Sequence, residues 1–236
     1  MVIEDVMEIN RRLFYDLWNI SDVAGSPTGL SPRLILPQRR SQDIRISEQE
    51  ARFLYCNLLN NLNYYYSVET PTEEVYRQKG LAPRSAASDL SLYVYENDKF
   101  KKVLNVEFKA HNPSKEHIRK DIEKFLKEET HGNWFHTLKN IDSQTLRVLF
   151  GKMVDSLKSC RELVSKSKRH LSIVFSFCVL EKKWACQKHF SYDFSIGSFD
   201  EYVNRFFKLE YTLKGGKVRV HQDGGWQIFI RSPEQE

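Results

Sequence analysis

The chain has 236 residues, 41% of them hydrophobic and 28% charged, which is enough apolar material for one substantial core. Its 36 Lys and Arg outnumber 31 Asp and Glu, and the resulting net charge of +5 does not by itself indicate a nucleic-acid partner. Because there is no apolar run of about twenty residues and no signal-peptide pattern, we expect a soluble, cytoplasmic protein with no membrane partner. The cysteines lack the paired spacing of a zinc site or a disulfide framework; they are Cys56, Cys160, Cys178 and Cys186.

The first predicted element is a helix over residues 6–20. Apolar side chains recur there at helical spacing, at Val6, Ile9, Leu13, Leu17 and Ile20. Glycine and proline between positions 25 and 37 end this pattern and predict an extended arm. The arm finishes with Gln38-Arg39-Arg40, which we expect to wrap the domain rather than to contact a phosphate backbone.

A second helix is predicted over residues 47–62, since Ser47 and Glu50 have the spacing of a capping box. Its inward stripe at four-residue steps would be Glu50, Leu54, Leu58 and Leu62. The tyrosine-rich segment 64–70 then predicts a strand that ends at Pro71. Residues 72–80 predict a short helix with a glycine stop.

The most informative segment is a predicted hairpin whose strands cover residues 88–95 and 103–110. Asp89 opens the first strand, and Glu107 and Lys109 close the second. Because side chains alternate between the faces of a strand, Glu107 and Lys109 share one face, and the opposite, buried face carries Leu104, Val106, Phe108 and Ala110. If the strands pair, two carboxylates and an ammonium group converge at one sheet edge, where a divalent cation could bind.

The remaining elements alternate between helices and strands. A charged helix over residues 114–128 would turn Ile118, Ile122, Phe125 and Leu126 inward, and Trp134 and Phe135 are expected in the core rather than stacked on a base. A helix capped by Asp142 or Ser143 runs to about residue 166, and the apolar run 171–180 predicts a central strand. A helix over 199–207, a hairpin over 211–220 with a Gly215-Gly216 turn and a strand over 226–230 complete the chain.

Asp89 and the Glu107-Phe108-Lys109 triplet, 18 positions apart (107 − 89), resemble the signature of the PD-(D/E)xK nuclease superfamily, the restriction-endonuclease-like fold. The proline that often precedes the first acid is absent, since Ala87-Ser88 stand there. The resemblance covers about residues 45–182. A second Glu-x-Lys triplet at Glu181 has no strand-borne Asp a hairpin's distance before it, so only the first match has the family's context.

The resemblance implies an α/β fold with a restriction-endonuclease-like mixed central sheet flanked by helices. It divides the chain into an N-terminal helix and arm (1–45), a nuclease-like core (46–182) and a C-terminal α/β extension with β-rich structure packed on the same domain (183–236).

The same resemblance implies a metal-dependent nuclease that hydrolyses phosphodiester bonds, with DNA as the expected partner. Asp89, Glu107 and the backbone carbonyl of Phe108 would bind Mg²⁺, with Mn²⁺ as a substitute, and Lys109 would orient water or steady the phosphate. In many members a glutamate on the first helix of the core also helps to bind metal or water. Here Glu50 is the candidate, with Glu48 as the alternate.

Other residues have weaker assignments. The segment 120–126 resembles a Lys-Asp-x-x-Lys-Leu helix of several of these nucleases, for which packing and backbone contact are expected. Glu69 could reach the site, although an exposed strand-end acid is the simpler interpretation, and Arg84 could meet a phosphate. Basic residues gather between Lys99 and Lys127 and again from position 152 to 169, as solvated helix faces or as rims for a polyanion.

Two other functions remain open or are set aside. The alternative is a non-cleaving nucleic-acid-binding or assembly module on the same fold. A sugar- or nucleotide-processing α/β enzyme is set aside because the chain lacks a glycine-rich phosphate loop. The sequence does not distinguish DNA from RNA, and a homodimer would suit cutting of both strands of a duplex.

Overall fold

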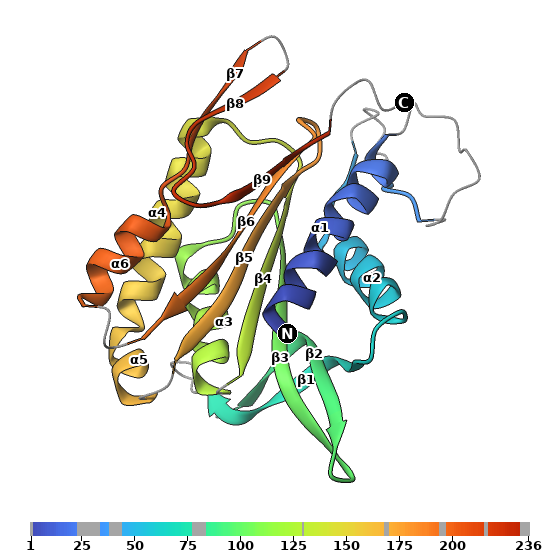
Figure 1. The fold of residues 1–236 in the computed structure, drawn as a ribbon, viewed down its shortest axis with the longest axis vertical. Helices are drawn as coiled ribbons and strands as arrows, with labels where there is room; N and C mark the ends of the chain where they lie inside the picture. The colour runs from blue at the N-terminus through green and yellow to red at the C-terminus, as the bar shows by residue number, and fades with distance from the viewer. Residues whose placement is uncertain are drawn as a thin grey trace.

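The computed structural model describes residues 2–22, 34–37, 44–76, 84–128, 130–167, 170–193, 197–214 and 217–231. Within these ranges seven strands form one mixed sheet in the order β1-β2-β3-β4-β5-β6-β9, and β7 pairs with β8 in a separate small sheet (Figure 1). The prediction of an α/β protein with a mixed central sheet flanked by helices and an additional C-terminal β element is thereby confirmed. No helix in the described ranges is both long enough and apolar enough to cross a membrane.

The helices and strands have the following bounds. The strands of the large sheet are β1 (Tyr65–Tyr76), β2 (Arg84–Glu96), β3 (Lys99–Ala110), β4 (His131–Leu138), β5 (Leu171–Val179), β6 (Trp184–Tyr192) and β9 (Gln227–Ile230). The small sheet consists of β7 (Glu210–Lys214) and β8 (Lys217–Gln222). The helices are α1 (Val2–Ser21), α2 (Glu48–Leu59), α3 (Lys115–Lys127), α4 (Ser143–Ser159), α5 (Arg161–Ser167) and α6 (Phe199–Phe206).

The sheet has an antiparallel half and a parallel centre. Strands β1, β2 and β3 pair antiparallel in chain order, and β3, β4 and β5 run parallel. The β3–β4 crossover contains α3, and the β4–β5 crossover contains α4 and α5, as parallel neighbours require. Strands β6 and β9 then close the far side antiparallel.

Strand β1 is longer than predicted. It runs through Pro71 to Tyr76, so the helix predicted over 72–80 is wrong for residues 72–76, while 77–80 lie outside the described residues. Proline is tolerated because β1 is an edge strand, where one side of the backbone needs no partner strand. The predicted arm at 38–40 and the Gly215-Gly216 turn also fall outside the described residues.

Helix α2 corrects the predicted stripe. The capping box of Ser47 and Glu50 is confirmed, but the helix ends at Leu59 rather than at residue 62, and Leu62 is 38% exposed. The buried positions are Ala51, Leu54, Tyr55 and Leu59. A strict four-residue step drifts by about 40° per turn from a helix of 3.6 residues per turn, which is why such a stripe rotates out of the core.

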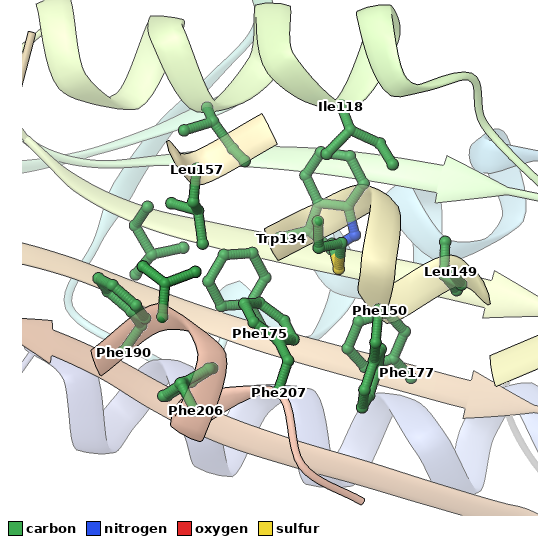
Figure 2. Packing of buried hydrophobic residues seen from close by; sticks show 14 of the residues in the cluster. Ile118, Trp134, Leu149, Phe150, Leu157, Phe175, Phe177, Phe190, Phe206 and Phe207 are labelled. Atoms are coloured by element: carbon green, nitrogen blue, oxygen red, sulfur yellow. The ribbon is translucent and has the colours of Figure 1, made fainter. Parts of the chain in front are cut away.

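Two hydrophobic cores lie on opposite faces of the sheet. Helices α1 and α2 cover one face, and α3, α4 and α6 cover the other (Figure 1). On the second face, Phe177 of β5 packs against Phe150 of α4 and Phe175 packs against Phe207, with ring centroids 5.1 and 5.2 Å apart, and Trp134 of β4 belongs to the same cluster (Figure 2). Leu171–Val179 is buried along its whole length, which confirms the predicted central strand. Trp134 and Phe135 are fully buried, so neither is free to stack on a base.

Helix α1 belongs to the same packed body although it precedes the segment that carries the resemblance. The Asn10 side chain donates to Asn133 Oδ1 and Ser176 Oγ, both at 2.9 Å, and Trp18 Nε1 donates to the Val179 carbonyl at 3.1 Å. These bonds tie α1 to β4 and β5. The predicted helix at 6–20 is confirmed, one turn longer at its start.

Gly132 sets how closely α3 approaches β4. A Cβ atom at this position would lie 2.8 Å from Cγ of Phe125, on α3, and 3.1 Å from Cγ1 of Ile173. We therefore expect Gly132→Ala to lower the free energy of unfolding by about 1–3 kcal/mol, the usual cost of overpacking. Gly151→Ala is the matched control: its Cβ would meet nothing within 4 Å, and helix propensity predicts a gain of about 0.5–1 kcal/mol. Urea denaturation of both variants measures this, and equal stabilities would contradict it.

Candidate active site

The candidate site lies where β2 and β3 separate. Their antiparallel ladder runs from Glu96–Lys99 to Leu90–Val106 and ends there. Beyond that point β2 stays paired with β1, and β3 stays paired with β4 as far as Ala110. The sheet therefore forks, and Asp89 and the Glu107–Lys109 segment stand on the two sides of this fork.

Asp89 bridges the fork. Its Oδ2 accepts a hydrogen bond from the backbone N–H of Phe108 at 2.7 Å, in place of the ladder bond that the separated strands no longer make. Since the N–H and C=O of one residue point the same way in a strand, the Phe108 carbonyl faces the fork as well. The predicted juxtaposition of Asp89 with the end of β3 is thus present in the structure.

Lys109 stands among three carboxylates. Its Nζ lies 4.0 Å from Asp89 Oδ2, 3.8 Å from Glu107 Oε2 and 3.1 Å from Asp121 Oδ2. Burial opposes its charge, but the charges of Asp121, Glu107 and Asp89 outweigh it and raise the pKa of Lys109 above its usual value. The amine also lies 5.7 Å from the centre of the Trp134 ring, a cation–π distance.

A second lysine, Lys124 of α3, completes the arrangement. Its Nζ lies 2.6 Å from Glu107 Oε1 and 2.8 Å from Asp121 Oδ1, and it donates to the Ala87 carbonyl at 3.1 Å. Burial again opposes the charge of Lys124, and Glu107 and Asp121 raise its pKa nonetheless. We call the set Glu48, Asp89, Glu107, Lys109, Asp121 and Lys124 the charged cluster.

Glu107 is the most unusual member of this cluster. Its side chain is fully buried, and neither carboxylate oxygen has a hydrogen-bond donor in good geometry among the described residues, although Lys124 lies in ion-pair contact. Burial first, and then the negative charge of Asp121, hold the pKa of Glu107 well above its ordinary value. A buried carboxylate with so few donors is costly, and a bound cation would offset that cost.

Of the two glutamates that begin α2, only Glu48 interacts with the charged cluster. Glu50, the first candidate, completes the capping box instead: its Oε2 accepts from the backbone N–H of Ser47 at 3.0 Å and from the Ser47 hydroxyl at 2.5 Å. Glu48 accepts a hydrogen bond from the backbone of Ala110, and burial raises its pKa in the field of Lys109 and Asp89. The choice of Glu50 is therefore corrected to Glu48, because the helix cap holds the Glu50 side chain.

Arg52 supports the fork from α2. It forms a close ion pair with Glu69 of β1, and its guanidinium donates to the Asp89 backbone carbonyl at 3.4 Å. Glu69 is exposed and adopts a positive φ of 49°, which marks an irregular point in β1. Glu69 thus acts through Arg52 rather than in the charged cluster, and the side chain of Arg84 lies outside the described residues.

Asp121 and Lys124 contribute more than the packing and backbone contact that the sequence predicts for their segment. They lie three residues apart on α3 and so share a helix face, which is also the face that buries Ile118, Ile122 and Phe125. Two charged residues on an otherwise apolar inward face are the signal in the sequence. Their partners cannot be found without knowing that α3 crosses over β3.

His136 is a further polar group on β4, beside Lys109 in the β3–β4 register. It is fully buried, and its Nε2 lies 2.6 Å from the His111 carbonyl, so this nitrogen is the donor. Burial, opposed by that bond, lowers the pKa of His136 to about 4. The ring is therefore neutral near pH 7 and adds no positive charge next to Lys109.

The donor set suits a hard divalent cation. Asp89, Glu107 and the Phe108 carbonyl offer oxygen ligands, and Mg²⁺ prefers a few such ligands while keeping several waters. If every acid is ionised, four carboxylates and two ammonium groups among the described cluster residues sum to −2, the charge that one Mg²⁺ neutralises. Among the described residues, no three His, Cys, Asp or Glu side chains are already placed to hold a metal ion together, and in the charged cluster Lys109 and Lys124 form ion pairs with the acids.

Comparisons of the chain with models of known protein families, with curated proteins and with solved structures find no match. The case for a function therefore depends on the geometry of the charged cluster and on the chemistry that its side chains permit.

Proposed function

We propose that this protein is a Mg²⁺-dependent nuclease, most simply a deoxyribonuclease, with its active site at the fork between β2 and β3. The observation that carries the proposal is the meeting of Asp89, Glu107 and Asp121 around the Lys109 ammonium group, at the fork between β2 and β3 and beneath α3. The strongest single sign is the buried Glu107 carboxylate, which lacks well-formed hydrogen bonds.

The order of elements supports the restriction-endonuclease-like interpretation of the fold. A helix (α2) precedes three antiparallel strands, the second and third of which carry the acids, and the charged helix α3 follows. This is the order that the resemblance implies around Asp89, Glu107 and Lys109. A hairpin whose charged side chains merely face solvent would not be expected to have this order of helices and strands around it.

Each side chain has a role in the proposed reaction. Asp89, Glu107 and the Phe108 carbonyl would hold the ion, which supplies an activated water and relieves charge on the phosphate. Lys109 would steady a non-bridging phosphate oxygen as a point charge. Asp121 and Lys124 position Lys109 and Glu107, since Asp121 contacts both lysines and Lys124 contacts both Glu107 and Asp121. Asp89 and Lys109 keep 21% and 12% of their side-chain surface exposed, so the site can meet a polyanion.

The alternative is a non-cleaving nucleic-acid-binding module, and one observation favours it. Lys124 and Lys109 together already form ion pairs with Glu107 and Asp121, so a cation must compete with two ammonium groups for these oxygens. A protein that binds nucleic acid equally well with Mg²⁺ and with EDTA, and cuts none of the substrates below, would establish this alternative.

The test is a cleavage panel of plasmid, linear duplex, single-stranded DNA and RNA, each with Mg²⁺, Mn²⁺ or EDTA. We expect cleavage with either metal and none with EDTA. Lys109→Met should slow cleavage about 100-fold, the usual cost of removing one group that stabilises transition-state charge. Lys115→Met, which removes an exposed lysine paired with Asp155, is the control and should cleave as the parent does. Equal rates in the two variants would refute the assignment of Lys109.

A further inference from the structure

An aromatic cluster is exposed at the tip of the β2–β3 hairpin. The rings of Tyr65, Tyr95 and Phe100 contact one another, with centroids 4.9 Å apart for Tyr65–Phe100, 5.0 Å for Tyr95–Phe100 and 6.3 Å for Tyr65–Tyr95. The three residues are 54%, 52% and 60% exposed. Tyr65 lies on β1, Tyr95 on β2 and Phe100 on β3, and we call this set the aromatic platform. Large apolar groups gathered in water usually mark a binding surface.

The platform lies on the same face of the sheet as the charged cluster. Along β2, side chains alternate, so Asp89, Ser91, Tyr93 and Tyr95 share one face, and Tyr95 pairs directly with Phe100. Tyr65 joins the same face because it pairs with Tyr93. Six residues at a rise of ~3.3 Å place Tyr95 about 20 Å from Asp89 along one strand.

The hairpin holds its rings in place. Asn97 and Asp98 both adopt positive φ, as a tight two-residue turn requires. The register shifts once, between Leu92 and Tyr93, and the pairing is then regular from Tyr93–Lys102 to Glu96–Lys99 at the tip. Lys102 forms an ion pair at 2.7 Å with the buried carboxylate of Glu128 at the end of α3, which anchors the hairpin to the body. Figure 1 shows the hairpin projecting beyond the helices, open to a large partner.

Charge near the platform is mixed, and two lysines of β3, Lys101 and Lys102, stand opposite uncharged residues in the described β2–β3 ladder. Lys99 stands opposite Glu96 in that ladder and is balanced by it. Lys101 is exposed but stands opposite Val94, so its side chain projects from the other face, whereas Lys102 stands opposite Tyr93 and shares the face of the rings. Aromatic rings beside a lysine are the combination on which unpaired bases stack while a phosphate meets the ammonium group.

We propose that the aromatic platform binds unpaired bases of the strand whose phosphodiester lies at Asp89, so that the substrate is a single strand or a duplex with a single-stranded extension. This inference rests on the proposed nuclease function, which places the scissile phosphodiester at Asp89, and it adds the class of substrate. At a stacked rise of ~3.4 Å, 20 Å corresponds to about six nucleotides between the site and the platform. A paired duplex presents no free base faces there, since its bases stack on each other.

Binding without metal tests the proposal separately from cleavage. Fluorescence anisotropy with labelled 12-nucleotide oligo-dT in EDTA compares the parent with Phe100→Ala and Tyr95→Ala. We expect each variant to bind about tenfold or more weakly, as loss of a stacked base contact predicts. Phe100→Tyr keeps a ring and should bind as the parent does. Val148→Ala, which removes an exposed apolar side chain on α4, is the matched control and should change nothing.

The outcomes separate this inference from the nuclease proposal. If Phe100→Ala binds oligo-dT as tightly as the parent, the platform does not bind bases, whatever the cleavage panel shows. If binding falls in Phe100→Ala but the parent cuts nothing with Mg²⁺, the platform stands and the nuclease proposal fails. If light scattering shows a parent dimer that Phe100→Ala turns into a monomer, the rings contact a second copy and the inference is overturned.

Discussion

Asp89→Asn is expected to slow Mg²⁺-dependent cleavage about 1,000-fold, because removing a carboxylate ligand forfeits several kcal/mol of charge stabilisation and each 1.36 kcal/mol is a factor of ten. The amide oxygen of asparagine can still accept from the Phe108 N–H, so the bridge across the fork is preserved. The variant should therefore fold as the parent does. Initial cleavage rates over a Mg²⁺ titration measure the effect.

Asp155→Asn is the control for this result. Asp155 is an exposed acid on α4 that pairs with Lys115 and lies outside the charged cluster, and its loss should leave the rate unchanged. If Asp89→Asn and the parent are purified to the same level and cleave at the same rate, the observed cleavage is not due to this site.

Lys124→Met is expected to lower the free energy of unfolding by about 3–5 kcal/mol in the absence of divalent ions. The change leaves Glu107 and Asp121 buried with one ammonium group fewer, and breaking a buried ion pair by removing one partner carries a cost of this size. Saturating Mg²⁺ should recover part of the loss, since an ion that binds the folded state alone stabilises it. Urea denaturation with EDTA and with Mg²⁺ gives both numbers.

Two further variants show whether the effect belongs to the buried pair. Lys115→Met removes one partner of an exposed pair and should cost less than about 0.5 kcal/mol. Glu107→Gln combined with Lys124→Met removes both charges and should be more stable than Lys124→Met alone. If the double variant is less stable by the sum of the two single losses, Glu107 and Lys124 are not energetically coupled.

Alternation of side chains along two strands is sufficient to predict that Asp89, Glu107 and Lys109 lie close together. A one-residue error in register would move these side chains to the other face, but the apolar residues Leu104, Val106 and Phe108 fix which face packs against α1 and α2. The capping box at Ser47 and the fully buried, mostly apolar strand β5 are equally predictable, because each depends on residues close together in the chain.

The parts that could not be predicted depend on contacts between distant segments. Glu48 and Glu50 are two residues apart, and only the placement of α2 against the end of β3 shows that Glu48 meets Ala110. Asp121 and Lys124 gain their partners through the crossover of α3 above β3. The length of β1 escapes prediction because Pro71 ordinarily ends a strand, and only its place at the sheet edge makes continuation past Pro71 acceptable.

The divergence of β2 from β3 below the Leu90–Val106 pair has a mechanical consequence. Asp89 is held in place by the pairing of β2 with β1, whereas Glu107 is held by the pairing of β3 with β4, so the spacing of the two acids depends on how these two pairs of strands are placed. The Phe108 amide spans that gap through a carboxylate rather than through a neighbouring strand. Hydrogen–deuterium exchange of the Phe108 amide therefore reports how often its hydrogen bond to Asp89 opens.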